Sequence, residues 1–339
     1  MHRTVFILLV FLFSMIETSA EEVNLSDWSI EQKVGQMFIV RGDFYDDGFL
    51  DIGVGGIFLD SQKYSENYSK LVAFYQNGSK IKLFVASDME GYWNPFSDFY
   101  SSKSFGDIKS KKDSFELGKQ HGEILKEMGF NMNFAPVVEV RNRVWPGRSF
   151  RGKNENVREM ISGYIQGLNT AGIHATAKHY PGGNMIKNPH WFFVKSEIFD
   201  ADLSFFESAI KSNVSAVMVG HAKTFGKVNS YGRQATVSQD VVGKLRADFP
   251  GLIITDEINM LGLKLSYMFN EKKMYLDLVN AGNDLILCAG LRKSKIDSGR
   301  VRRAIGYIAQ EVKRGAISEE RIDDSVRRIL RTKGYDVVD

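Results

Sequence analysis

The chain has 339 residues, of which 43% are hydrophobic and 25% are charged, and its formal net charge is +3. Its length allows one large domain or two modest ones, and its composition is ordinary for a globular protein. So small an excess of positive charge argues against nucleic acid as a partner. The single cysteine, Cys288, excludes an intramolecular disulfide, and its apolar neighbours predict a buried and unreactive thiol.

The start of the chain differs from the rest. A basic beginning precedes an apolar run over residues 5–13, and small residues end the segment at Ala20. This pattern predicts a secretory signal peptide over residues 1–20 and a mature domain over residues 21–339, and hence an exported bacterial protein that is periplasmic or secreted. An uncleaved anchor is the alternative, but the run is short for a bilayer. After cleavage we expect no stable membrane insertion.

From residue 36 onward, short apolar segments alternate with amphipathic helical patterns. The apolar segments are hydrophobic on both faces and are bounded by Gly, Asn or Asp, which is typical of strands covered on both sides. Eight such strands with helices between them predict an α/β fold, a single (β/α)8 barrel of the TIM type. An open doubly wound sheet is the alternative, but no glycine-rich phosphate motif follows the first strand.

The predicted strands cover residues 36–40, 55–59, 83–87, 130–138, 173–178, 216–219, 252–255 and 284–288. The predicted helices cover residues 29–36, 114–128, 156–170, 201–212, 238–248, 273–280, 300–314 and 318–332. The last of these helices begins at Ser318, a residue type that favours the N-cap position.

Polar residues lie at or after the ends of five of the predicted strands. Active sites of such barrels gather at the carboxyl ends of the strands, so these residues are expected to converge. A single strand-end acid often only caps the next helix. Five polar strand ends together predict a pocket for a polyhydroxylated ligand. The residues are Asp88 and Glu90 after the third strand, Glu139 and Arg148 after the fourth, Lys178 and His179 at the fifth, His221 at the sixth, and Asp256 and Glu257 at the seventh.

The Lys178-His179 pair ends an apolar strand, and Pro181 with two glycines follows it closely. Burying a lysine costs free energy unless the ammonium is paired or binds a ligand. We therefore favour a binding site at this position. A pair that is satisfied by neighbouring carboxylates, with no ligand, is the alternative.

Other chemistries find less support in the sequence. There is no HExxH, paired CxxC or Walker motif, and the histidines lack a metal-ligand spacing, so no metal or other cofactor is expected. A metal assembled from Asp88, His179 and His221 is a less favoured alternative. A Ser-His-Asp hydrolase is also less favoured, because no serine lies at a G-x-S-x-G elbow. Carboxylates with a lysine, an arginine and histidines fit sugar binding and glycosidic chemistry best.

Four segments resemble family 3 glycoside hydrolases and occur in the same order as in that family. They are residues 133–137 (Asn-Phe-Ala-Pro-Val), 148–150 (Arg-Ser-Phe), 177–182 (Ala-Lys-His-Tyr-Pro-Gly) and 254–257 (Ile-Thr-Asp-Glu). Residues 29–37 and 317–322 extend the resemblance over nearly the whole mature chain. The chain is most similar to single-domain bacterial β-N-acetylglucosaminidases that trim peptidoglycan fragments. The family fold is a barrel of the predicted kind.

The resemblance implies an activity. It implies an exo-acting, retaining β-N-acetylhexosaminidase that removes terminal GlcNAc from peptidoglycan-derived or related glycosides. The substrate would be an amino-sugar glycoside or a muropeptide, and the protein would act as a monomer without cofactors.

The resemblance also assigns roles to individual residues. Asp256 matches the catalytic nucleophile, which would form a covalent glycosyl-enzyme. Lys178 and His179 resemble the pair that binds the sugar hydroxyls, and Arg148 and Asp88 match further sugar contacts. The alternative for Asp256 is a helix cap.

The loop after the fifth strand departs from the family pattern. Members of this type carry a histidine acid/base that an aspartate two residues earlier orients. Here His190 falls at the histidine position if the loop is one residue shorter, but Asn188 replaces the aspartate. The missing charge would leave the imidazole less basic and less well oriented, unless Glu257 or another loop acid takes its place. The alternative is that His190 only packs beside Trp191 on a surface loop.

A second departure follows Glu90, where Gly91-Tyr92-Trp93 replaces the Gly-Gly-Arg that is usual in the family. Its aromatic side chains could stack on a sugar face. Three alternatives to the hexosaminidase follow from the resemblance and its departures: a catalytically impaired sugar-binding descendant, a β-glucosidase, and a glycoside phosphorylase of the same family.

Overall fold

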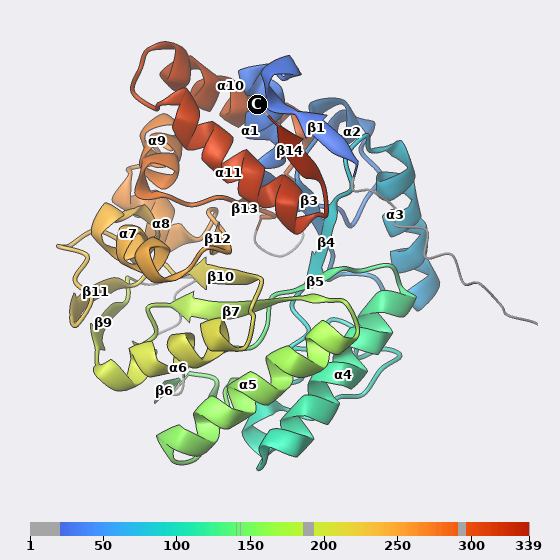
Figure 1. The fold of residues 1–339 in the computed structure, drawn as a ribbon, viewed down its shortest axis with the longest axis vertical. Coiled ribbons are helices and arrows are strands. Elements are labelled where there is room, and N and C mark those ends of the chain that lie inside the picture. The colour runs from blue at the N-terminus through green and yellow to red at the C-terminus, as the bar shows by residue number, and fades with distance from the viewer. Residues whose placement is uncertain (1–20, 140, 143, 186–192, 291–295, 339) are drawn as a thin grey trace, which may run out of the picture.

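The computed structural model describes residues 21–139, 141–142, 144–185, 193–290 and 296–338. Its centre is an eight-stranded sheet in which all neighbouring strands are parallel and follow one another in chain order (Figure 1). The strands are β2 (Phe38–Arg41), β3 (Gly56–Phe58), β4 (Phe84–Ser87), β5 (Met132–Asn133), β7 (His174–Tyr180), β10 (Ala216–Val219), β12 (Leu252–Thr255) and β13 (Ile286–Cys288).

The two ends of this sheet meet. β13 pairs with β2, and an isolated parallel bridge joins Ile254 of β12 to Leu285, just before β13. The sheet is therefore a nearly closed barrel. The predicted (β/α)8 barrel is confirmed, and all eight predicted strand positions hold a strand.

Helices follow the strands around the barrel and cover its outer face (Figure 1). They are α1 (Ile30–Gln36), α2 (Asp47–Ile52), α3 (Ser65–Gly78), α4 (Lys111–Glu127), α5 (Asn154–Thr170), α6 (Asp200–Lys211), α7 (Gln239–Asp248), α8 (Leu261–Ser266), α9 (Glu271–Ala281), α10 (Ser298–Lys313) and α11 (Glu319–Thr332). In the described part of the chain, no helix combines the length and apolar character needed to cross a bilayer.

Three small two-stranded pairings lie outside the barrel. They join β1 (Glu22–Asn24) to β14 (Asp336–Val338), β6 (Arg141–Asn142) to β8 (Asn184–Met185), and β9 (Lys195–Ile198) to β11 (Lys223–Gly226). The β1–β14 pair brings the two ends of the described chain side by side (Figure 1).

Two predicted boundaries were wrong for identifiable reasons. The strand expected over residues 130–138 is reduced to β5, because Pro136 has no amide hydrogen to donate and the ladder continues only as a bridge from Val137 to Lys178. The helix expected from residue 114 begins earlier, because the Ser110 side chain accepts a hydrogen bond from the Asp113 amide and caps α4.

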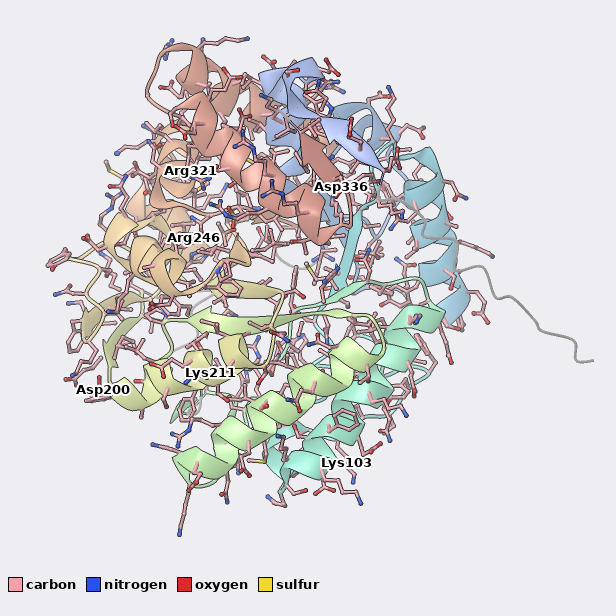
Figure 2. All side chains as sticks on the ribbon, in the orientation of Figure 1. Lys103, Asp200, Lys211, Arg246, Arg321 and Asp336 are labelled. Carbon is pink, nitrogen blue, oxygen red and sulfur yellow. The ribbon has the colours of Figure 1, made fainter. Side chains whose placement is uncertain are left out.

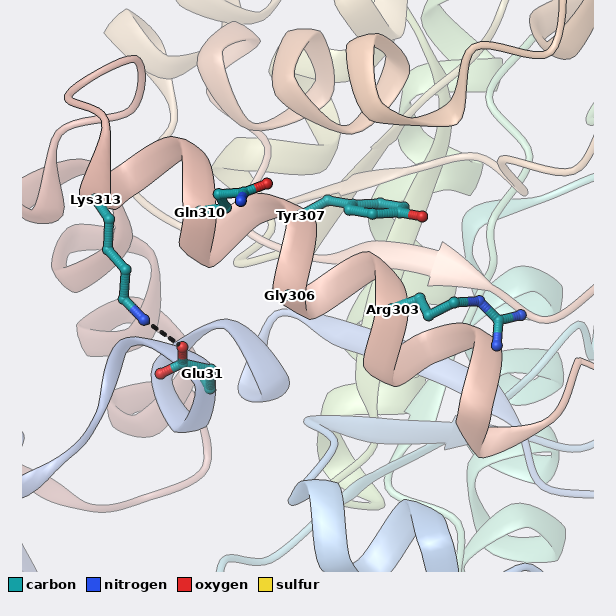
Figure 3. Close-up of a pocket in the computed structure, with 6 residues that line it drawn as sticks. All are labelled: Glu31, Arg303, Gly306, Tyr307, Gln310 and Lys313. Carbon is teal, nitrogen blue, oxygen red and sulfur yellow. Dashed lines mark hydrogen bonds and ion pairs between the residues drawn. The ribbon is translucent and has the colours of Figure 1, made fainter.

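Ion pairs fasten the N-terminal helix α1 to the two C-terminal helices. Lys33 pairs with Asp323 at 2.8 Å and with Glu319 at 3.2 Å on α11. Glu31 pairs with Lys313 of α10 at 2.9 Å (Figure 3). The Lys33 side chain is only 5% exposed, so its pairs lose little to solvent screening, whereas both partners of the Glu31–Lys313 pair are exposed.

A buried carboxylate, Asp284, joins the strands to α7 and α11. It accepts hydrogen bonds from the guanidinium of Arg246, from Arg328 at 3.1 Å and from the Ser325 hydroxyl at 2.7 Å. It also accepts one from the Ile253 amide at 2.9 Å, and its side chain is fully buried. Figure 2 shows Arg246 and also Arg321, which donates to the neighbouring Asn283 carbonyl.

Replacing Asp284 is expected to destabilise the fold strongly. The substitution Asp284→Asn would leave two arginines without their countercharge in a buried site, which costs about 3 kcal/mol in the free energy of unfolding. Urea denaturation at pH 7 measures the loss. The matched control, Asp51→Asn on the exposed face of α2, should change stability by less than about 0.5 kcal/mol. Equal effects of the two substitutions would contradict the role assigned to Asp284.

Candidate active site

A cavity of about 690 Å³ opens at the carboxyl ends of the barrel strands. The strand-end residues Glu139, His221 and Glu257 line it, as do five of the six residues to which the resemblance assigns a role: Asp88, Arg148, Lys178, His179 and Asp256. These five come from four different strands or the loops that follow them, so the barrel brings together residues that are up to 168 positions apart in sequence (256 − 88). Such a concave site with a few polar groups is typical of a small-molecule binding site.

A bulge at the end of β7 turns two consecutive side chains toward this cavity. Met218 of β10 pairs with Lys178, whereas the next residue, Val219, pairs with Tyr180, so His179 is the extra residue. In a regular strand, neighbouring side chains point to opposite faces. A bulge breaks this alternation and re-aims a side chain. Both Lys178 and His179 therefore line the cavity.

Lys178 is buried between two carboxylates. Its Nζ lies 2.5 Å from Asp88 Oδ1 and 2.6 Å from Glu90 Oε1, and its side chain is 2% exposed. Burial alone would lower the pKa of Lys178, but the two carboxylates outweigh it and raise the pKa, so the ammonium stays charged. The ion pairs required by the alternative interpretation are thus present. The lysine nevertheless forms part of the cavity wall.

Glu90 connects Lys178 to Arg148. The Arg148 guanidinium donates two hydrogen bonds to Glu90, from Nε at 2.6 Å and from Nη2 at 2.8 Å. Burial alone would raise the pKa of Glu90, but the charges of Arg148 and Lys178 lower it to about 2. Such a fork holds the guanidinium plane in one orientation. Arg148 itself lines the cavity, so the fixed guanidinium can meet a ligand there.

Hydrogen bonds to the backbone of Met89 hold the turn that carries Asp88 and Glu90. The Asn133 side chain accepts from the Met89 amide at 2.9 Å and donates to the Met89 carbonyl at 3.0 Å. The Tyr164 hydroxyl donates to the same carbonyl and in turn bonds His121 Nδ1. Because Met89 separates the two acids, its clamp fixes the directions of both carboxylates.

His179 lies between two acids of the cavity. Its Nδ1 is 3.3 Å from Glu139 Oε1, outside hydrogen-bond alignment, and its Nε2 is 3.9 Å from Asp256 Oδ2. The ring packs against Gly220, where an added Cβ would lie 3.0 Å from the His179 Cβ. The imidazole thus stands next to the carboxylate that follows β12.

Asp256 follows directly after β12 and its side chain is 18% exposed to the cavity. Its amide donates to the Val219 carbonyl, and its Oδ1 accepts from the Glu257 amide at 2.8 Å. Glu257 is used differently: it accepts from the Asn259 amide at 2.8 Å and from the Ala289 amide at 2.6 Å. These bonds give Glu257 a structural role in joining the loops after β12 and β13.

His221 is neutral and has a defined tautomer. Its Nε2 lies 3.0 Å from the Glu257 carbonyl, which can only accept, so Nε2 carries the hydrogen and Nδ1 keeps its lone pair. Burial lowers the pKa of His221, and the nearby Asp256 carboxylate offsets part of that change. The site therefore has a neutral imidazole close to Asp256.

Residues 29–332 match the family described as the glycosyl hydrolase family 3 N terminal domain. This match covers most of the chain. The chain belongs to glycosyl hydrolase family 3. The resemblance found in the sequence is thereby confirmed for the family and for its barrel fold.

Individual relatives of the family support this assignment at low identity. The beta-hexosaminidase A of Pseudoalteromonas piscicida is 26% identical over 297 residues, which cover 77% of this chain and 49% of that protein. A beta-hexosaminidase of Haemophilus influenzae is 26% identical over 266 residues, covering 72% of this chain and 74% of that protein. The chain thus spans about half the length of the first of these relatives.

Solved structures of the family share the fold. A family 3 beta-N-acetylglucosaminidase from Paenibacillus sp. has a TM-score of 0.79 at 27% identity, and the match covers 90% of this chain and 62% of that chain. M tuberculosis LpqI has a TM-score of 0.80 at 23% identity, over 91% of this chain and 95% of that chain. The second likeness is evidence for the fold alone.

Two residues that were singled out from the sequence lie outside the described residues. His190 and Asn188, the expected acid/base and the residue in place of its aspartate, fall between residues 185 and 193, and their predicted roles stay predictions. Within the ranges that the structure describes, no three His, Cys, Asp or Glu side chains converge as a metal site would require.

Part of the cavity wall was not predicted from the sequence. Arg41, the last residue of β2, lines the cavity and pairs with Asp43 at 2.6 Å and Asp60 at 2.5 Å. The predicted first strand stopped one residue before this arginine. A single arginine after an apolar run is a weak signal, and its two acids lie in separate loops. Only the pairing of β2 with β3 brings them together.

A second hollow of about 450 Å³ lies outside the barrel, along α10 and beside α1 (Figure 3). Its lining includes the Glu31–Lys313 ion pair and the side chain of Arg303. None of the strand-end residues contributes to it. The hollow is therefore separate from the cavity at the strand ends.

Glu90 is expected to stabilise the fold in a pH-dependent way. Because the pKa of Glu90 is lower in the folded chain than in the unfolded one, its ionised form stabilises the fold above about pH 4.5, and this contribution is lost as the pH falls toward 2. The substitution Glu90→Gln should lower the free energy of unfolding by about 3 kcal/mol at pH 7 and by about 1.5 kcal/mol at pH 3.

Urea unfolding at the two pH values measures this difference. The exposed Glu155→Gln is the matched control and should have little effect at either pH. A Glu90→Gln loss that stays constant or grows on acidification would show that the ion pairs with Lys178 and Arg148 do not stabilise the fold.

Proposed function

We propose that this chain is an exo-acting, retaining β-N-acetylhexosaminidase that removes terminal GlcNAc from peptidoglycan-derived or related glycosides. One observation carries the proposal: Asp256 opens on the same cavity as the Lys178-His179 pair, although the two lie on separate strands. The names of the relatives, beta-hexosaminidase and beta-N-acetylglucosaminidase, support the amino sugar as substrate.

In the proposed reaction, Asp256 is the nucleophile. One of its carboxylate oxygens forms a bond with the anomeric carbon while the bond from that carbon to the leaving-group oxygen breaks. The leaving oxygen takes a proton from His190, the proposed acid. A water molecule then gives a proton to the same histidine and attacks the anomeric carbon, which frees Asp256 and retains the configuration.

The remaining residues of the cavity hold the sugar. Lys178 and Asp88 form a donor and an acceptor 2.5 Å apart, which suits a hydroxyl that both donates and accepts. The side chain of Arg148 is oriented by Glu90 and lines the same cavity. Because these groups are already fixed by one another, binding a sugar requires little further ordering of side chains.

Removing the nucleophile should abolish turnover and allow a chemical rescue. Asp256→Gly is expected to lower kcat for an aryl β-GlcNAc glycoside by more than about a thousandfold. Added azide should restore release of the aryl group by attacking from the side that the carboxylate has vacated, and NMR of the product should show the α-glycosyl azide.

A matched control separates this loss from a general effect of losing an acid. Asp240→Gly on the exposed face of α7 should keep full activity. A β-glycosyl azide, or an Asp256→Gly variant as active as the wild type, would contradict the assignment of Asp256.

The histidine loop gives a second prediction. His190→Ala should lower kcat/KM by about a hundredfold or more for a disaccharide, whose leaving group needs a proton, and by much less for a nitrophenyl glycoside. Asn188→Asp, which restores the family's aspartate, should raise the rate on the disaccharide, because the carboxylate would make the imidazole more basic. Equal losses on both substrates would count against His190 as the acid.

The Asn188 departure favours one second candidate, a sugar-binding descendant without turnover. Calorimetry that detects GlcNAc binding, together with no product from any glycoside and no effect of His190→Ala, would support this candidate. A phosphorylase of the same family is tested in the same assays: product formation that depends on added phosphate would reveal phosphate in place of water as the acceptor.

A further inference from the structure

Two indole rings, Trp93 and Trp145, form one wall of the cavity. Their ring centroids are 6.0 Å apart and the rings are nearly perpendicular, at 81°. The Arg148 guanidinium lies over both, 5.9 Å from the Trp93 ring and 5.4 Å from the Trp145 ring. Both tryptophans line the cavity, and Trp93 keeps 37% of its surface exposed.

The backbone holds this wall in place. Residues 90–93 form a tight turn in which the Glu90 amide donates to the Trp93 carbonyl at 2.9 Å, and Gly91 adopts a positive φ of 80°. Next to it, the Tyr92 ring packs on Gly147, where an added Cβ would lie 2.6 Å from the ring. The loops after β4 and β5 therefore interlock, and the two indoles are fixed relative to the Glu90–Arg148 pair.

The strand order places this wall across the mouth from Asp256. Trp93 follows β4, and Asp256 follows β12. Three strands separate β4 from β12 in one direction (β5, β7, β10) and three in the other (β3, β2, β13). Lys178, one of the groups proposed to hold the sugar, comes from β7, which lies between β4 and β12, whereas Asp88 follows β4 on the side of the wall.

On a pyranose ring, C4 lies opposite the anomeric carbon. A sugar with its anomeric carbon at Asp256 and its hydroxyls at Lys178 therefore directs C4 toward the wall. We propose that Trp93 and Trp145 close the cavity beyond the 4-hydroxyl, so that only a sugar with a free O4 fits. This inference rests on the proposed function, and it names the residues that confine the enzyme to the non-reducing end of its substrate.

The composition of the wall fits a boundary better than a further sugar subsite. The two indoles contact the Arg148 guanidinium, whose charge Glu90 neutralises. The wall is therefore bulky and mostly apolar. A subsite for another sugar would need polar groups for its hydroxyls. The alternative, an aromatic platform for the leaving group, predicts that the tryptophan variants change the preference between leaving groups.

The test compares an aryl β-GlcNAc glycoside with its 4-O-methyl derivative. For the wild type, kcat/KM should be at least about a hundredfold lower for the 4-O-methyl substrate. In Trp93→Ala, and in the double variant with Trp145→Ala, the ratio of the two kcat/KM values should rise about tenfold or more. Tyr64→Ala removes an exposed aromatic that neither lines the cavity nor packs on the wall, and it should leave the ratio unchanged.

Several outcomes would overturn the proposal. These are a wild type that cleaves both substrates equally well, a ratio that the tryptophan variants do not change, and variants that alter only the preference between methyl and nitrophenyl leaving groups. If the alanine variants do not fold, Trp93→Phe tests the same ratio with a smaller change.

Calorimetry separates a failure of this inference from a failure of the proposed function. If the wild type cleaves no glycoside, binding of free GlcNAc and of 4-O-methyl-GlcNAc to the intact protein still tests the wall. Binding of GlcNAc alone would support it, whereas equal binding of both sugars, or of neither, would overturn it.

Discussion

The shared burial of Lys178, Glu90 and Arg148 is the constraint on which the rest of the site depends. A lysine or arginine buried without a countercharge would be strongly destabilising. Glu90 contacts both cations, at 2.6 Å each, and is itself fully buried. The three charges therefore hold one another in place, and they fix the side chains that face the cavity before any ligand arrives.

The barrel supplies what this cluster needs. Its parallel strands all end at the same rim, so Glu90 just after β4, Arg148 in the long loop after β5 and Lys178 within β7 come together there. The bulge in β7 then adds His179 on the same side as Lys178. The two hydrogen bonds between the Asn133 side chain and Met89 attach the turn with Asp88 and Glu90 to β5.

The same cluster links binding to the shape of the cavity. Arg148 is held by Glu90 on one side and lies over the two indoles of Trp93 and Trp145 on the other. A change at either tryptophan therefore removes an aromatic contact of Arg148, while the two hydrogen bonds to Glu90 still hold the guanidinium. The proposed boundary of the cavity thus rests on the same charged cluster as the proposed sugar contacts.

The sequence by itself determined the eight strands, the barrel and the set of acids and bases at the strand ends, because buried parallel strands appear as local apolar runs and polar residues interrupt them. It did not determine how two consecutive residues, Lys178 and His179, both come to face the cavity, that Arg41 meets Asp60, or that Trp93 touches Trp145. These depend on a strand bulge and on pairings between distant loops. Only the closed barrel decided them, since such contacts join residues whose separation in sequence carries no periodic signal.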